Sequence, residues 1–126
     1  MMRPFHLAAA LACAVLISAA QPAAAMPEAG KSAPPFTGTT SKGKPVSLID
    51  FRGKTVVLEW TNHQCPYVGK HYSSNNMQAL QKAAVADGAV WLQIISSAPG
   101  TQGHVGATEA DALNEKRGAV PTAVLL

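Results

Sequence analysis

The sequence predicts a single α/β domain, and three features of the chain support this fold class. Apolar runs and segments of helical character follow each other in the order strand, helix, strand, helix, strand. This order is typical of a sheet whose parallel strands are joined by right-handed crossovers. The chain has 126 residues, which suits one domain at most. Because 48% of the residues are hydrophobic and 13% are charged, the composition differs from that of a disordered chain.

The charge pattern gives no sign of a nucleic-acid partner. The formal net charge is +3, but the basic residues are scattered, and only Lys116 and Arg117 are adjacent. A nucleic-acid-binding domain gathers its Lys and Arg side chains on one face or in one run. We therefore expect no nucleic-acid binding.

Residues 1–25 have the parts of a secretory signal peptide. A short basic start precedes an apolar stretch from Leu7 to Ala20, and Ala23–Ala25 supplies the small residues of a cleavage site. The stretch is shorter than the ~20 apolar residues that span a bilayer, so we expect no stable membrane anchor. The protein is then exported, to the periplasm or outside the cell, after cleavage near Ala25.

The expected mature chain divides into an N-terminal arm over residues 26–40 and a domain over residues 41–126. The arm is rich in Pro, Gly, Ser and Thr. In the domain, Val46–Leu48 suggests a short strand. The β-branched and aromatic run Thr55–Trp60 is typical of a strand that is buried on both faces.

The rest of the domain predicts helices and two more strands. Pro66 suits the first position of a helix, and no strand pattern follows before Ala86. A polar patch at 73–76 predicts one kinked helix or two short ones, with Asn75 as a cap. Further elements are expected as a strand over 89–96, a loop with three glycines, a helix over 109–117 capped by Thr108, and a strand over 121–126.

Cys65 is the main candidate for chemistry. It lies directly before Pro66, so its sulfur is expected at a helix N-terminus, where free N–H groups and the helix dipole stabilise a thiolate. Signal-peptide cleavage removes Cys13 and leaves Cys65 as the only cysteine. It is then buried and inert, paired with another molecule, or reactive. The polar neighbours Asn62, His63 and Gln64 favour a reactive thiol.

Several segments resemble a known family. Cys65-Pro66-Tyr67-Val68 is similar to the Cys-x-x-Cys active site of thioredoxin-fold proteins, with Val68 in place of the second cysteine. The segments that resemble the redoxin or alkyl hydroperoxide reductase/thiol-specific antioxidant group, which is peroxiredoxin-like, are 33–36, 43–48, 52–60 and 118–122. Together they span most of the mature chain.

The resemblance implies a thioredoxin-like fold, with a mixed sheet flanked by helices, and thiol redox chemistry that uses no cofactor and no metal. Cys65 would attack a peroxide or disulfide substrate, and an external thiol reductant or partner redox protein would restore it. Glu59 matches the buried acid of thioredoxins and would relay protons. The alternative is an edge-strand acid that faces solvent.

The resemblance assigns Pro121, and the remaining site residues are assigned by their position next to Cys65 in the sequence. Pro121 would form the family's cis-proline turn and face Cys65 across the site, the alternative being an ordinary trans proline at the start of a strand. His63 would tune the pKa of Cys65. The other members of the helix N-terminus and active-site loop are Thr61, Asn62, Pro66 and Tyr67.

The sequence also departs from the peroxiredoxin pattern. Leu58 and Asn62 stand where that pattern has Pro and Thr, and Thr61 lies one position away from the expected Thr. The family's last hairpin strand and C-terminal helix would follow Leu126, so we expect a truncated domain. Two alternatives to an antioxidant enzyme stay open. One is a redox-inactive binding module, and the other is a copper carrier that uses His63, Cys65 and His104.

Overall fold

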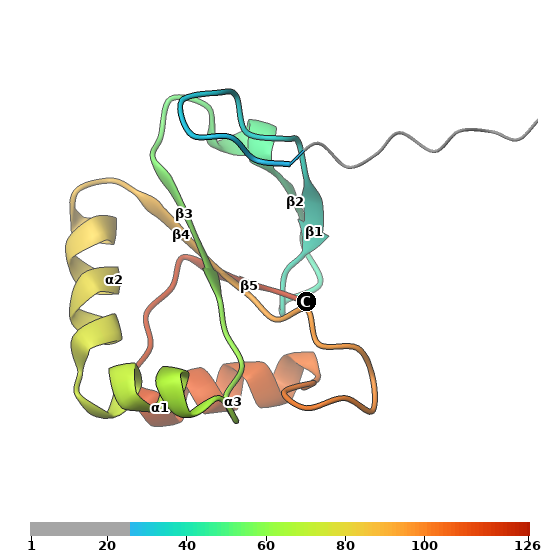
Figure 1. The fold of residues 1–126 in the computed structure, drawn as a ribbon, viewed down its shortest axis with the longest axis vertical. Coiled ribbons are helices and arrows are strands. Elements are labelled where there is room, and N and C mark those ends of the chain that lie inside the picture. Colours follow the sequence, from blue (N-terminus) through green and yellow to red (C-terminus); the bar gives the residue numbers. More distant parts are fainter. Residues whose placement is uncertain (1–25) are drawn as a thin grey trace, which may run out of the picture.

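The computed structural model describes residues 26–126, so the expected signal peptide over residues 1–25 lies outside the described residues. Figure 1 shows strands flanked by helices and by a small hairpin. The elements are β1 (Thr37–Thr39), β2 (Pro45–Ser47), the 3-10 helix η1 (Leu48–Phe51), β3 (Val56–Trp60), α1 (Pro66–Ser73), α2 (Asn76–Ala86), β4 (Val90–Ile94), α3 (Ala107–Arg117) and β5 (Ala123–Leu125). Among residues 26–126, every helix falls short of the length and apolar character that a bilayer crossing requires.

The main sheet has three parallel strands in the order β3-β4-β5. The strands β1 and β2 form a separate antiparallel hairpin. This hairpin meets the outer edge of β5, where the Ser41 N–H donates to the Val124 carbonyl at 2.9 Å and the Leu126 N–H donates to the Thr39 carbonyl at 3.1 Å. The α/β class and the combination of parallel and antiparallel strands agree with the prediction.

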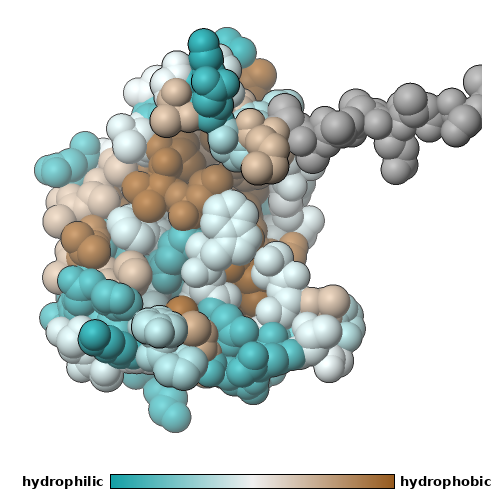
Figure 2. All heavy atoms as spheres, viewed as in Figure 1, coloured by the Kyte–Doolittle hydropathy of each residue, from teal (hydrophilic) through white to brown (hydrophobic). Residues whose placement is uncertain are grey.

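The two faces of the main sheet are packed differently. On one face, Val90, Leu92 and Leu125 form an apolar core against the hairpin and η1. On the other face, α3 packs Ala110 against Val124, and polar side chains fill much of the space between the strands and the helices. Figure 2 shows hydrophobic side chains gathered over the strands and hydrophilic ones along the edge that carries α1 and α3.

The region from Pro66 to Ala86 forms two helices. Of the two predicted arrangements, one kinked helix or two short helices, the second is correct. The break lies at Asn75, whose φ of 59° is left-handed. Asn tolerates this conformation better than most residues because its short polar side chain bonds locally. The predicted cap at Thr108 is wrong, since α3 already begins at Ala107, after Gly106.

Two further expectations about the strands are corrected. Part of the N-terminal arm, for which no strand was predicted, forms β1, because it pairs with β2. The strand β3 is not buried on both faces, since Leu58 is 37% exposed and Trp60 is 63% exposed. Among the described residues β3 is an edge strand, so only its side toward β4 is paired.

Candidate active site

Cys65 lies at the N-cap of α1, directly after the loop that leaves β3. Pro66 occupies the first helical turn, and the Gly69 N–H donates to the Cys65 carbonyl at 3.0 Å. The thiol is free and half-buried. The predicted placement of this cysteine at a helix N-terminus is confirmed. The first N–H groups of a helix have no partner within the helix, so they are available to stabilise a thiolate sulfur.

Asn62 organises the loop that carries the cysteine. Its side-chain oxygen accepts the Gln64 N–H at 2.9 Å, and its carbonyl accepts the Cys65 N–H at 3.0 Å. Its side-chain nitrogen donates to the Gln102 carbonyl at 3.4 Å. Asn62 therefore connects the cysteine loop to the glycine-containing loop before α3.

Gly103 is a site residue that the sequence reasoning did not single out. It is buried, has a φ of +83°, and a Cβ atom there would overlap the Asn62 side chain. Only glycine allows both this backbone conformation and so close an approach. The signal that pointed here was the unusual length of a loop with repeated glycines, since such loops are often functional.

The other predicted loop residues differ in exposure. Thr61 is 8% exposed, and its hydroxyl has no hydrogen-bond partner among the described residues. Its N–H donates to the Ile94 carbonyl at 2.9 Å, which extends the pairing of β3 with β4. Tyr67 is 77% exposed on the first turn of α1, and His63 is half-buried.

Glu59 is the centre of a buried polar network. One carboxylate oxygen accepts from the Tyr72 hydroxyl at 2.7 Å and from Gln93 at 3.5 Å. The other accepts from the Trp91 indole N–H at 2.7 Å and from Gln81 at 3.0 Å. The alternative of an edge-strand acid facing solvent is therefore wrong. None of these bonds comes from the Cys65 loop, so a proton relay through Glu59 stays a prediction.

Tyr72 lies between this network and Arg117 at the end of α3. Burial, followed by the hydrogen bond to Glu59, raises the pKa of Tyr72 well above its usual range. The hydroxyl therefore stays protonated and keeps donating to the carboxylate. The Arg117 guanidinium lies 3.9 Å from the centroid of the Tyr72 ring and bonds to the Asn114 side-chain oxygen at 2.6 and 3.0 Å.

The predicted cis-proline wall is wrong. No peptide bond within residues 26–126 is cis, so Pro121 is trans. Since β5 runs parallel to β3, Pro121 precedes the amino end of one strand while Cys65 follows the carboxyl end of another. The two residues thus lie toward opposite ends of the parallel strands. The trans form is favoured by about 0.5–1 kcal/mol unless packing selects cis, and the alternative of an ordinary trans proline is correct, although Pro121 lies two residues before the start of β5.

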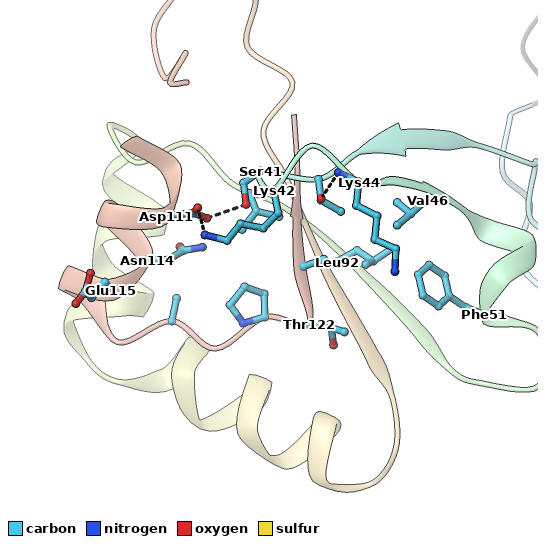
Figure 3. A pocket seen from close by; sticks show the side chains of 15 residues that line it. Ser41, Lys42, Lys44, Val46, Phe51, Leu92, Asp111, Asn114, Glu115 and Thr122 are labelled. Carbon is cyan, nitrogen blue, oxygen red and sulfur yellow. Dashed lines mark hydrogen bonds and ion pairs between the residues drawn. The ribbon is translucent and has the colours of Figure 1, made fainter. Parts of the chain in front are cut away.

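Pro121 instead lines a cavity of roughly 570 Å³ between the hairpin and α3 (Figure 3). At its rim, Ser41 and Lys42 bond to the Asp111 carboxylate at 2.7 and 2.6 Å. These hydrogen bonds, from Lys42 first and then Ser41, lower the pKa of Asp111. Cys65 does not line this cavity.

The residues of the copper-carrier alternative are not gathered in one place. Within residues 26–126, no group of three His, Cys, Asp or Glu side chains is arranged to hold a metal ion. The His104 ring nitrogen Nδ1 donates to the Ser97 carbonyl at 2.9 Å, within its own loop. The arrangement of His63, Cys65 and His104 that this alternative needs is therefore not present in the described part of the chain.

Comparison with known proteins identifies a family. A family model described as "AhpC/TSA family" matches residues 29–117. One similar solved structure is the pneumococcal exposed lipoprotein thioredoxin Etrx1 from Streptococcus pneumoniae strain TIGR4, with 28% identity and a TM-score of 0.47. The alignment covers 72% of this chain and 64% of that one, so this chain spans less than two thirds of that protein's length. The search of curated proteins gave no significant match.

The family match covers most of the described residues and includes β1 through α3, with the Cys65 loop inside it. It agrees with the α/β architecture and supports a function in thiol redox chemistry. The chain therefore belongs to the AhpC/TSA family of thioredoxin-like redoxins.

Proposed function

We propose that this protein is an exported thiol oxidoreductase with antioxidant activity, in which Cys65 is the redox-active nucleophile. The observation that carries the proposal is the half-buried thiol at the N-cap of α1, in the one cysteine that follows residue 25. A helix N-terminus stabilises an anionic sulfur, and the thiolate is the form that attacks peroxides and disulfides. The basic, apolar and small-residue sequence of residues 1–25 supports export.

The reaction with a peroxide has two stages. The Cys65 sulfur attacks one peroxide oxygen, an S–O bond forms, the O–O bond breaks, and an alcohol or water leaves with the thiol proton. The resulting sulfenic acid condenses with an external thiol to give a mixed disulfide and water. A second external thiol then attacks this disulfide, restores Cys65 and leaves as an oxidised disulfide. The external thiol is required because Val68 stands where thioredoxins have a second cysteine.

The neighbouring residues have positioning roles in this proposal. Asn62 fixes the backbone of the cysteine loop through its bonds to Gln64 and Gln102. His63 is close enough in sequence to affect the charge around the sulfur. Glu59 is proposed as a proton relay for Cys65, held behind α1 by the hydrogen bond that it accepts from Tyr72.

The test is trapping of the sulfenic acid by mass spectrometry. The full chain, carrying Cys13→Ser so that Cys65 is its only thiol, receives one equivalent of hydrogen peroxide and a sulfenic-acid trap at neutral pH. We expect rapid modification of Cys65 and none in a Cys65→Ser variant. If a folded protein, verified by circular dichroism, leaves Cys65 unmodified, the peroxidase proposal is wrong.

A redox-inactive binding module is the second candidate, and Val68 is the observation that favours it, because the dithiol is missing. The two candidates differ in the reactivity of Cys65. A binding module would leave this thiol no more reactive than free cysteine toward both peroxides and neutral disulfides.

A further inference from the structure

A groove of roughly 490 Å³ lies between α1 and α3, and it begins beside the cysteine loop. His63, two residues before Cys65, lines one part of it, and Gly69 lines the next. The Gly69 N–H is bonded to the Cys65 carbonyl. Four helical residues correspond to about 6 Å along the axis, so the groove lies within the reach of a small molecule that touches the sulfur.

The floor of the groove is open above Gly69. A Cβ atom at that position would meet nothing within 4 Å. The glycine therefore adds no side chain to the lining of the groove along the first turns of α1.

The groove carries positive charge and no acid. Its charged lining residues are Lys116 and Arg117 from the end of α3, with His63 as a titratable neighbour, and no Asp or Glu side chain lines it. Lys116 is exposed. Arg117 is held by the neutral Asn114 side chain and by the Tyr72 ring. The Glu59 carboxylate is separated from the groove by Tyr72, to whose hydroxyl it is bonded.

We propose that this groove binds the carboxylate of an anionic substrate and so places its peroxide or disulfide bond at Cys65. The inference rests on the proposed function and adds the chemical class of the substrate. Lys116 supplies an exposed, movable charge, while Arg117 is oriented in advance by its two bonds to Asn114. An ordered guanidinium recognises a carboxylate at little entropic cost.

Two disulfide probes test this inference. Dithiobis(nitrobenzoate) carries a carboxylate on each ring, and dithiodipyridine is neutral. With either probe the Cys65 thiolate attacks one sulfur, a new S–S bond forms, the old one breaks, and an aromatic thiolate is released, which is followed by its absorbance. The rate constant for the anionic probe is divided by the rate constant for the neutral probe. This ratio, divided by the same ratio for free cysteine, is the normalised ratio, and it measures how strongly the protein selects the anion.

The variants are compared in the full chain with Cys13→Ser. We expect Lys116→Gln to lower the normalised ratio about fivefold at low salt, as for the loss of one charge near a partly solvated carboxylate. Lys116→Glu should lower it further. Salt should reduce the ratio in the parent protein, because exposed charges are screened over about 10 Å at 0.1 M. The matched control is Lys82→Gln, which makes the same change of net charge on α2, outside the groove.

The outcomes separate the two proposals. If Lys116→Gln and Lys82→Gln change the ratio equally, net charge alone selects the anion and the groove proposal is overturned. The groove proposal is also overturned if neither variant changes the ratio. If the neutral probe reacts with Cys65 no faster than with free cysteine, the reactive-thiol proposal fails, whatever the ratio shows.

Discussion

Replacement of Glu59 by Gln tests whether the buried network stabilises the fold. This change keeps the size of the side chain but turns one acceptor oxygen into an amide nitrogen. In the wild type, the two oxygens accept four hydrogen bonds from neutral donors on α1, α2 and β4. Whichever oxygen is replaced, the new N–H₂ group faces donors.

The less costly orientation of the amide directs its nitrogen toward Tyr72. The Tyr72 hydroxyl cannot readily accept a bond from it, because it already accepts from Gln81 at 3.0 Å and Gln93 at 2.8 Å. The variant thus loses one short, charge-assisted bond and leaves a buried donor unpaired. Each of these effects costs about 1–3 kcal/mol. Since Glu59 is only half-buried, we expect Glu59→Gln to lower the free energy of unfolding by about 2–4 kcal/mol.

The measurement is urea unfolding at neutral pH, followed by far-ultraviolet circular dichroism. Glu115→Gln is the matched control, because Glu115 is exposed on α3 and its side chain has no hydrogen bond among the described residues. The control should stay within about 0.5 kcal/mol of the wild type. An unfolding free energy for Glu59→Gln equally close to the wild type, with the same urea dependence, would refute the reasoning.

Three further predictions concern single positions. Gly103→Ala should lower the free energy of unfolding by about 1–3 kcal/mol in urea titrations and slow the reaction of Cys65 with a neutral disulfide, because a Cβ atom there displaces Asn62; an unchanged rate would contradict the role of this contact. Asn75→Ala should cost about 1 kcal/mol in thermal unfolding because of its left-handed backbone, while Asn75→Gly should cost nothing measurable, and equal losses would contradict that cause. The pKa of Asp111 is lower in the folded protein than in the unfolded chain. The ionised carboxylate therefore stabilises the fold at pH values above the pKa of the unfolded chain, and this stabilisation is lost as the pH falls through the pKa of the folded protein. Asp111→Asn should therefore lower stability by no more than about 1 kcal/mol at pH 7 and by less at pH 3 in urea titrations; a loss independent of pH would exclude the ionised carboxylate as its source.

The position of Cys65 was predictable from the sequence because the determinants are local. A β-branched run, a polar loop and a Pro at the first helical turn are enough to locate the sulfur at the start of α1. The break near Asn75 was predictable for the same reason, since a patch of short polar side chains interrupts the apolar helical pattern.

The error at Pro121 has a different origin. A proline followed by an apolar run predicts the start of a strand, but the run is equally compatible with a parallel or an antiparallel neighbour. Strand direction is decided by which element pairs with β5, and that element is β4, separated from it by α3. The residues around Pro121 do not determine which strand pairs with β5. The expected contact between Pro121 and Cys65 therefore depended on the family resemblance alone.

The environment of Glu59 could be predicted only in part. Its distance from Cys65 along the chain suggested a buried acid, but its partners come from α1, α2 and β4. Gln81 and Gln93 are both fully buried. The spacing of apolar residues along the chain does not predict that polar side chains lie in the interior. A pattern built on hydrophobic spacing treats these glutamines as surface residues.

The contrast between the two tryptophans gives the molecule a pair of optical probes with opposite surroundings. Trp60 is 63% exposed at the end of β3, whereas Trp91 is 7% exposed and its indole N–H is bonded to Glu59. A soluble quencher therefore reaches Trp60 and leaves the emission of Trp91 to be observed separately. Because its indole N–H donates directly to the Glu59 carboxylate, the emission of Trp91 reports whether this hydrogen bond is intact inside the folded protein.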